Sequence, residues 1–292
     1  MIEKISFSPQ EQYPEKNNKE KIKELEGFLK KLSEQLRKEG LPVEDNCRIS
    51  EKDYIFSEEN FNNRKYFLSR EQAEELYSLN KIKEDQEKIL EREKEWFQEE
   101  NQEIIKEKRK KKVGEQFEML KTAILNKFLN DKFYIIRTNL SDDIFNKVDN
   151  VIIEKETGKT ICAFDEIGDI NSERFLEKKD KVLLKNKEGV KLKYGLKIQE
   201  GKIFLGEVKN LPIFYLAFDF RHFNKVLSEF PSDFKEKSDC EKRAFEFFTT
   251  LILKEASDLY KKRIEINPEV LENIEHFSRI LKKYQSPKKK EN

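Results

Sequence analysis

The sequence predicts an α+β protein in which a long, highly charged helical N-terminal half precedes a compact α/β core and closing helices. Three observations support this prediction. Charged residues make up 40% of the 292 residues, well above the roughly 25% of a typical globular domain, and such an excess favours long solvated helices. Leucines recur at helical spacing near the N-terminus. Short apolar runs typical of strands, separated by turn residues, occur across positions 133–218.

The first helix is predicted from apolar residues that alternate in steps of three and four along the chain: Ile22, Leu25, Leu29, Leu32 and Leu36. Gly40 and Pro42 end the pattern. It covers about two heptads, which is too short for a stable coiled coil on its own. We therefore expect this helix to pack on the next one.

A second, longer helix is expected to begin after Ser69, because Gln72 stands at the reach-back position of a capping box, and to run to about residue 112. Its apolar residues repeat every seven positions, as in Ile82, Ile89 and Trp96, although Gln and Glu interrupt the pattern. Residues 1–112 are accordingly interpreted as a charged helical arm, either a helical hairpin or coiled-coil-like. Dimerisation, or binding of a protein partner, through this arm is left open.

The charge balance, the cysteine spacing and the absence of known motifs exclude several classes of protein. The 59 basic and 58 acidic residues leave a net charge of +1, so the chain does not coat nucleic acid by bulk charge. The cysteines, Cys47, Cys162 and Cys240, show no zinc-site or disulfide spacing, and no P-loop, GxGxxG, GxSxG or HExxH motif occurs. No stretch is apolar enough for a membrane span and no signal core is found, so we expect a cytoplasmic protein that does not bind membranes.

A basic stretch at 106–112, with the sequence KEKRKKK, precedes the predicted core. It supplies candidate contacts to nucleic-acid phosphates, and Lys193 in a later strand adds another. The candidates in the stretch are Lys108, Arg109, Lys110, Lys111 and Lys112. The competing interpretation is a solvated helix face, because the adjoining helix is rich in compensating Glu.

Residues 113–220 are predicted to form the α/β core, and residues 221–292 to form helices that pack on it. An amphipathic helix at 115–130 comes first. Strands are expected at 133–138, 148–154, 160–167, 181–184, 190–198, 202–208 and 213–218, and closing helices at about 221–229, 239–263 and 268–284. This order of elements is that of an α+β domain.

Two of the predicted strands each place a carboxylate on an otherwise apolar face. Asp149 alternates with Val151 and Ile153, and Asp165 follows Ile161 and Ala163 in the same way. A buried carboxylate is costly unless it is paired or binds a metal. The competing interpretation is that both acids stand at exposed strand ends.

The helix at 115–130 carries Glu118 and Lys121 inside its apolar arc, so both are expected to point towards the sheet. Glu118, Asp149 and Asp165 are then candidate ligands of one Mg²⁺ or Mn²⁺ ion, because hard cations prefer carboxylate oxygens. Asp142 and Asp143, before the second strand, are interpreted as loop-capping residues, with a supporting role around the metal site as the alternative.

This order of elements and acids resembles the PD-(D/E)XK nuclease superfamily. The resemblance is carried by Gly114 to Glu118 on the helix, by the segment 148–153 around Asp149, and by the segment 163–167 around Asp165. Members share a core of a helix, three or four mixed strands and a further helix, and many cut DNA with Mg²⁺. The resemblance implies a restriction-endonuclease-like mixed sheet flanked by helices. It further implies metal-ligand roles for Asp149 and Asp165, with Glu118 or Glu115 as the helix acid.

The chain departs from the family at the motif lysine. Ile167 stands two positions after Asp165, where the family has Lys. Some members relocate this lysine, and the candidates here are Lys121, Lys191 and Lys193, with Lys121 first. Without a relocated lysine, the domain is an inactive relative that only binds nucleic acid.

Two functions of different classes follow as hypotheses. The first is a Mg²⁺-dependent nuclease, or a nuclease-derived nucleic-acid-binding protein, with Asp149, Asp165, Glu118 and Lys121 at its site. The alternative is a non-enzymatic scaffold that binds a partner or dimerises through its helical arm. Convergence of the carboxylates beside a lysine distinguishes the first from the second.

Overall fold

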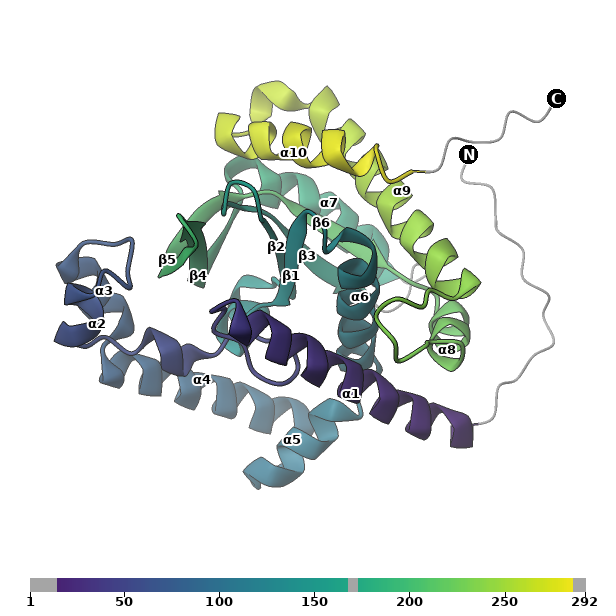
Figure 1. Cartoon of the computed structure of the whole chain (residues 1–292), viewed down its shortest axis with the longest axis horizontal. Coiled ribbons are helices and arrows are strands. Elements are labelled where there is room, and N and C mark those ends of the chain that lie inside the picture. The colour runs from purple at the N-terminus through teal and green to yellow at the C-terminus, as the bar shows by residue number, and fades with distance from the viewer. Residues whose placement is uncertain (1–14, 168–172, 286–292) are drawn as a thin grey trace.

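The structure is a computed structural model that describes residues 15–167 and 173–285, and it shows helices packed around a small mixed sheet (Figure 1). The main sheet has the strand order β1-β2-β3-β6. Its strands are β1 (Phe133–Arg137), β2 (Asn150–Glu154), β3 (Thr160–Ile167) and β6 (Ile213–Ala217). β1, β2 and β3 pair antiparallel, whereas β6 runs parallel to β3.

A parallel neighbour requires a crossover connection. Between β3 and β6 the chain forms helix α7 (Glu173–Glu188) and a separate hairpin of β4 (Val190–Gln199) and β5 (Lys202–Leu211). Helix α7 packs on β6. The crossover therefore covers the sheet beside the strand that it introduces.

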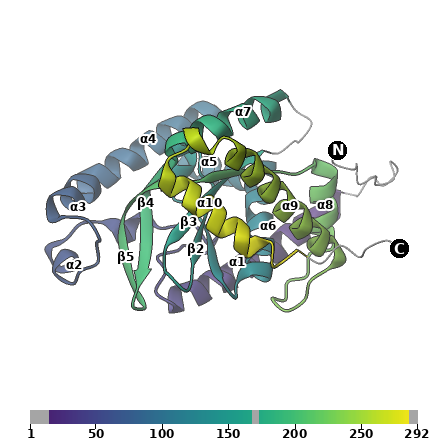
Figure 2. The same cartoon turned by 90° about the horizontal axis from the view of Figure 1, so that it is seen from above.

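Two helices pack on one face of the main sheet. Asn150 of β2 donates a hydrogen bond to Thr122 in α6 (Val113–Leu129) at 2.8 Å. Its cross-strand neighbour Phe164 lies with its ring centroid 6.3 Å from that of Phe277 in α10 (Pro268–Leu281). Helix α9 (Asp239–Lys261) contacts α6, β6 and α10. Figure 1 shows α10 lying over the sheet, with α4 and α5 on the opposite side of the molecule, and Figure 2 shows α10 in front of the sheet from above.

The remaining elements complete the description. The helices are α1 (Glu15–Lys38), α2 (Glu58–Asn62), α3 (Arg70–Tyr77), α4 (Leu79–Phe97), α5 (Gln102–Lys110) and α8 (Phe220–Ser228). Short helical turns are η1 (Glu51–Tyr54), η2 (Asp142–Asn146) and η3 (Arg263–Glu265). None of the described helices is both long enough and apolar enough to cross a membrane.

The leucine pattern of the first helix is buried within this chain. Helix α1 packs on α6 and α8, and Leu25, Leu29 and Leu36 are buried in a hydrophobic core that continues to Leu281 near the C-terminus. The prediction that this helix packs on the next one is corrected, because its apolar stripe meets helices much later in the sequence. The predicted domain boundary at residue 112 is the start of a new helix, and residues on both sides of it contribute to one hydrophobic core.

The single helix expected from Ser69 to about residue 112 is also corrected, because it is three helices. The capping box of Ser69 and Gln72 is present at the start of α3. Ser78 then leaves the helical conformation, with ψ of 149°, between α3 and α4. Gln98 has a left-handed φ of 48°, and the Asn101 side chain caps the start of α5. Local caps therefore break a pattern whose heptad spacing alone favoured one helix.

The core elements follow the prediction closely, with one exception. Strand β3 has the predicted bounds, and the other strands of both sheets begin and end within a few residues of expectation. The expected strand at 181–184 is wrong, because these residues belong to α7. Its short apolar run fits a strand or a buried helix turn equally well, and the packing of Val182 in the core decides for the helix.

Candidate metal centre

Three carboxylates from three elements converge beside α6. Glu118 lies on α6, Asp149 directly precedes β2, and Glu166 lies near the end of β3. Their ligand oxygens all lie within 4.8 Å of one another. Antiparallel pairing of β2 with β3 brings the start of one strand beside the end of the other, and Asp149 donates its N–H to the Phe164 carbonyl at 2.8 Å. Glu118 and Asp149, predicted from the sequence as ligands, thus lie together.

Asp165, the third predicted ligand, lies outside this group of oxygens, and Glu166 takes its place. Side chains alternate along a strand, so Glu166 shares the face of Phe164 that packs on α6. Asp165 points to the other face, where its Oδ2 lies 3.6 Å from Lys185 Nζ and its strand neighbour is Tyr215 of β6. The sequence prediction selected Asp165 because it treated only one face of β3 as buried, whereas both faces are buried.

Both strand acids are buried. The exposed fraction is 7% for Asp149 and 4% for Asp165. The interpretation of these residues as acids at exposed strand ends is therefore excluded. Each is buried among charged or hydrogen-bonding partners, as the cost of burying a carboxylate requires.

Lys121, one turn after Glu118 on α6, completes the group. Its side chain is fully buried and forms an ion pair with Glu166. Its Nζ also lies 5.7 Å from the centroid of the Phe164 ring. Burial lowers the pKa of Lys121 to about 8, against the opposing attraction of Asp149 and Glu118. The first of the three candidate lysines is therefore the one that lies beside the acids.

The other two candidate lysines are engaged elsewhere. Lys193 forms an ion pair with Asp85 of α4, and Lys191 forms one with Glu207 of β5. Both contacts lie in the β4–β5 hairpin region, which is a separate sheet. Neither lysine contacts the carboxylate group, so neither takes the place of the motif lysine.

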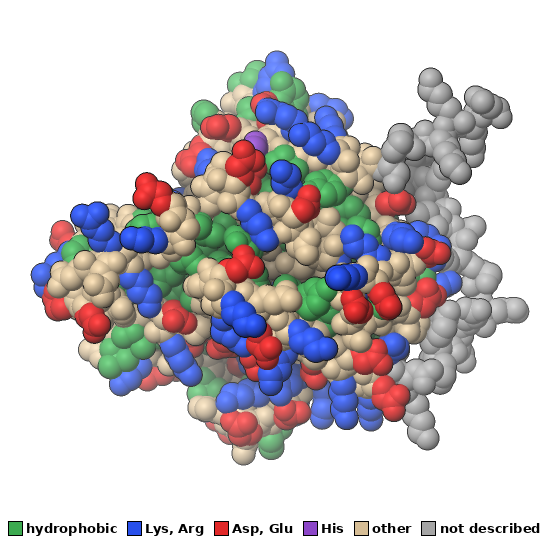
Figure 3. Space-filling view, in the orientation of Figure 1, with side chains coloured by type: hydrophobic (Ala, Val, Ile, Leu, Met, Phe, Trp, Pro, Cys, Tyr) green, Lys and Arg blue, Asp and Glu red, His purple; other side chains and the backbone are tan. Residues whose placement is uncertain are grey.

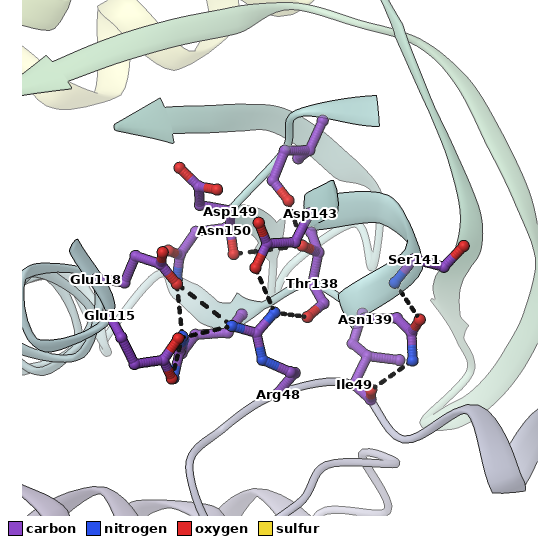
Figure 4. Close-up of polar contacts among 12 residues, drawn as sticks. Arg48, Ile49, Glu115, Glu118, Thr138, Asn139, Ser141, Asp143, Asp149 and Asn150 are labelled. Atoms are coloured by element: carbon purple, nitrogen blue, oxygen red, sulfur yellow. Dashed lines mark hydrogen bonds and ion pairs between the residues drawn. The ribbon is translucent and has the colours of Figure 1, made fainter. Parts of the chain in front are cut away.

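Two arginines hold the helix acids in position. Arg48 contacts Glu118 at 3.3 Å and Asp143 at 2.9 Å, and Figure 4 shows its guanidinium between these two groups. Arg137, at the end of β1, is fully buried and pairs with both Glu118 and Glu115. Both arginines donate to Oε2 of Glu118. The other oxygen of this carboxylate, Oε1, accepts no hydrogen bond from the described residues.

The acids of the cluster differ in their protonation behaviour. Burial, followed by the negative charge of Asp143, raises the pKa of Glu118 to about 7. Burial, followed by the charge of Glu118, raises the pKa of Asp149. Burial also opposes ionisation of Glu115, but Arg137 and Arg48 outweigh it and lower the pKa of Glu115 to about 2. Glu115 is thus an ionised partner of the arginines. For Glu118 and Asp149, burial and the repulsion from neighbouring acids outweigh the attraction of the nearby basic groups.

The predicted basic stretch lies on α5 and the turn that follows it. Four of its basic residues pair with nearby acids: Lys106 with Glu103, Lys108 with Glu99, Arg109 with Glu93 and Lys110 with Glu107. Lys111 is exposed, and Lys112 lies over aromatic rings of α4. Apart from Lys112, which adjoins α6, the stretch therefore matches the solvated-face interpretation in its local contacts.

Several residues of the site were not identified from the sequence. Arg48 lies 70 residues before its partner Glu118, in a loop with no local motif, so no sequence signal points to it. Arg137 ends an otherwise apolar strand, and a basic residue in that position is a weak signal of a buried acid nearby. Glu166 adjoins a predicted acid, and only the packing of α6 distinguishes the two.

Comparisons of the chain with protein-family models, with curated proteins and with solved structures find no match.

Proposed function

We propose that this protein is a divalent-cation-dependent nuclease with a diverged restriction-endonuclease-like core. The observation that carries the proposal is the convergence of Glu118, Asp149 and Glu166 within 4.8 Å, with Lys121 against Glu166. The ligands differ from those implied by the family resemblance in one position, because Glu166 replaces Asp165. The expected Mg²⁺ or Mn²⁺ requirement is part of the proposal.

The donor set fits a hard divalent cation. All three side chains offer carboxylate oxygens, the ligands that Mg²⁺ and Mn²⁺ prefer. Oε1 of Glu118 and Oδ1 of Asp149 accept no hydrogen bond from the described residues, because the arginines use Oε2 and the Glu166 N–H donates to Oδ2 of Asp149 at 2.7 Å. Burial and mutual repulsion raise the pKa values of Glu118 and Asp149, and a cation relieves that repulsion.

Lys121 supplies the basic group that the motif position lacks. It reaches the carboxylates from the helix, whereas the family lysine stands on the strand. A divalent cation at such a site lowers the pKa of water and stabilises charge on a phosphate. Lys121 holds a proton beside Glu166 and adds positive charge where a phosphate would approach. Arg48 and Arg137 orient Glu118 from behind.

The order of the elements supports the same proposal. Helix α6, strands β1, β2 and β3, helix α7 and strand β6 follow one another, with the β4–β5 hairpin inserted before β6. The family resemblance implied a helix, three or four mixed strands and a further helix in that order. The acids occupy the helix, the start of the second strand and the end of the third.

The alternative function, a scaffold that dimerises through its N-terminal arm, is not favoured by the packing of α1. Its motivation was an apolar stripe in need of a partner. Leu25, Leu29 and Leu36 are already buried against α6, α8 and the common core, so the stripe has a partner within the chain.

The proposal is tested by cleavage assays on single- and double-stranded DNA and RNA with Mg²⁺, with Mn²⁺ and with a chelator. Wild-type protein is compared with Asp149→Asn and Glu166→Gln, purified identically. Glu87→Gln, a substitution of an exposed acid on α4, serves as the matched control. Metal-dependent cleavage lost in both site variants but kept in the control supports the proposal. Cleavage that survives in the site variants, or is absent from wild type with either metal, contradicts it.

A further inference from the structure

A partly exposed aromatic surface lies beside the proposed metal centre. Trp96, near the end of α4, has 44% of its surface exposed. Three basic side chains from three segments surround its ring: Arg92 at 5.4 Å, Lys112 at 5.4 Å and Lys147 at 5.6 Å from the centroid. Lys112 also lies 4.2 Å from the Phe97 ring. We call Arg92, Trp96, Phe97, Lys112 and Lys147 the Trp96 surface.

The charge of the Trp96 surface is less compensated than that of the basic stretch on α5. Lys112 and Lys147 are exposed, and neither forms an ion pair with a described residue. Arg92 pairs with Glu95, and the neighbouring Glu93 is engaged by Arg109. Over most of the face shown in Figure 3, basic and acidic side chains are interspersed. Uncompensated positive charge is thus gathered around one aromatic ring.

Covalent connections place this surface next to the carboxylates. Lys112 is the residue before α6, with Glu115 and Glu118 one and two turns further along the helix. Lys147 is two residues before Asp149, so their Cα atoms lie at most about 7 Å apart. Lys185 donates to the Lys147 carbonyl at 3.4 Å and contacts Asp165 at 3.6 Å. A strand bound on the Trp96 surface would therefore lie close to the candidate metal ligands.

The backbone of Lys147 adopts a conformation that is rare for residues other than glycine. Its φ is 57°, in the left-handed region, where it ends η2. Such a conformation in a residue other than Gly or Asn is uncommon and carries a cost. The Lys147 side chain reaches Trp96 from this strained position.

We infer that the Trp96 surface binds single-stranded nucleic acid, with one base stacked on Trp96 and the flanking phosphates on Lys112 and Lys147. The inference rests on the proposed nuclease function and specifies its substrate. Single-strand sites combine stacking on aromatic rings with basic groups that follow the backbone. A paired base in a duplex does not offer its face to a side chain, so the exposed ring favours an unpaired strand. A protein with a net charge of +1 needs such a local site, because bulk charge does not supply one.

The only tryptophan of the chain is the probe for this inference. Trp96 fluorescence is measured with a chelator present, so that cleavage does not interfere, while oligothymidylate, oligouridylate or a duplex of equal length is added. We expect quenching by a single strand and not by the duplex. Affinity is then measured by anisotropy of a labelled oligonucleotide. Trp96→Ala should weaken binding about tenfold or more, because loss of base stacking carries that magnitude, and Trp96→Phe should retain most of it.

The basic residues are tested with a matched control. Lys112→Gln and Lys147→Gln should each weaken binding and reduce its salt dependence. Lys110→Gln, which removes an exposed lysine that is already paired with Glu107, should leave binding unchanged. Equal binding by wild type and Trp96→Ala, equal affinity for duplex and single strand, or absence of binding overturns the inference. Binding by Asp149→Asn without cleavage supports it, and binding by wild type with no cleavage in any metal keeps this surface but rejects the proposed nuclease.

Discussion

Asp142 and Asp149 are two buried aspartates on either side of the same turn, and their surroundings differ. The oxygens of Asp142 accept hydrogen bonds from the backbone N–H groups of Lys193 at 2.8 Å and Tyr194 at 3.0 Å, and from the Asn146 side chain at 2.7 Å. Asp149 accepts one N–H, from Glu166 at 2.7 Å. The neighbours of Asp149 include the carboxylates of Glu118 and Glu166, and the charge of Lys121 acts on it as well.

This comparison shows that burial and a raised pKa do not by themselves identify a metal ligand. Burial raises the pKa of Asp142 to about 6 and also raises that of Asp149. Both oxygens of Asp142 accept hydrogen bonds from uncharged donors, and the backbone donors belong to β4 rather than to the loop of Asp142. Its role is therefore structural, but it joins η2 to a distant strand and does not cap its own loop, which corrects the loop-capping interpretation. Asp149 keeps an oxygen without a protein donor among the described residues and faces other acids.

The largest expected effect is a loss of cleavage activity, and it distinguishes Asp149 from Asp142. Asp149→Asn should lower metal-dependent cleavage more than about 100-fold, because loss of a ligand exceeds the 10–100-fold cost of losing an outer-shell partner. Its circular dichroism spectrum should remain that of wild type. The measurement is the initial cleavage rate at saturating Mg²⁺ or Mn²⁺. A decrease of less than a few fold would assign Asp149 to the same structural class as Asp142.

The second prediction is that substitution of Asp142 lowers the stability of the folded protein. Asp142→Ala leaves the N–H groups of Lys193 and Tyr194 without their acceptor, and each unsatisfied buried group costs about 1–3 kcal/mol. We therefore expect the free energy of unfolding to fall by about 2–6 kcal/mol in urea denaturation. Asp142→Asn, which retains one acceptor oxygen, should lose less. An unchanged urea midpoint for Asp142→Ala would contradict the structural role.

The third prediction concerns the effect of the cation itself on stability. A ligand that binds only the folded state stabilises it by about 2.7 kcal/mol at one hundred times its dissociation constant. We expect Mg²⁺ or Mn²⁺ to raise the thermal midpoint of wild type and a chelator to reverse the change. Asp149→Asn should show no increase, whereas Glu87→Gln should respond as wild type. An equal increase in Asp149→Asn would place the cation elsewhere.

The smallest expected effect is on pH dependence. The pKa of Glu118 is raised from 4.5 to about 7, first by burial and then by the charge of Asp143. The folded chain thus holds a proton that the unfolded chain releases between these values, so this group's contribution to stability falls as pH rises through the interval. A cation competes with that proton. Its affinity should therefore rise with pH, by up to about tenfold per pH unit, through the range in which Glu118 loses its proton.

Thermal shifts with Mg²⁺ at pH 6 and pH 8 measure this dependence. Glu118→Gln removes the titrating carboxyl and should flatten the pH profile, along with weakening the binding. An affinity that is the same at both pH values in wild type would show that Glu118 is not a ligand that titrates in this range.

Local sequence patterns were sufficient to predict most elements of the core. The Ser69 and Gln72 capping box, the bounds of β3 and the helix of Glu118 all depend on residues within a few positions of one another. Such signals are complete in a short segment of sequence. The inward direction of Lys121 followed in the same way from its place in the apolar arc of α6.

The site itself depended on packing between distant segments. Asp165 and Glu166 are adjacent acids in a strand that is buried on both faces, and only the docking of α6 decides which of them joins Glu118 and Asp149. Arg48 reaches Glu118 across 70 residues of sequence, and α1 finds its partners in α6 and α8. Sequence patterns were enough to predict the order and type of the core elements other than α7, together with two of the converging acids, because periodicity and capping act locally. Tertiary structure decided the third acid, the arginines and the burial of α1, because those contacts exist only after distant segments have packed together.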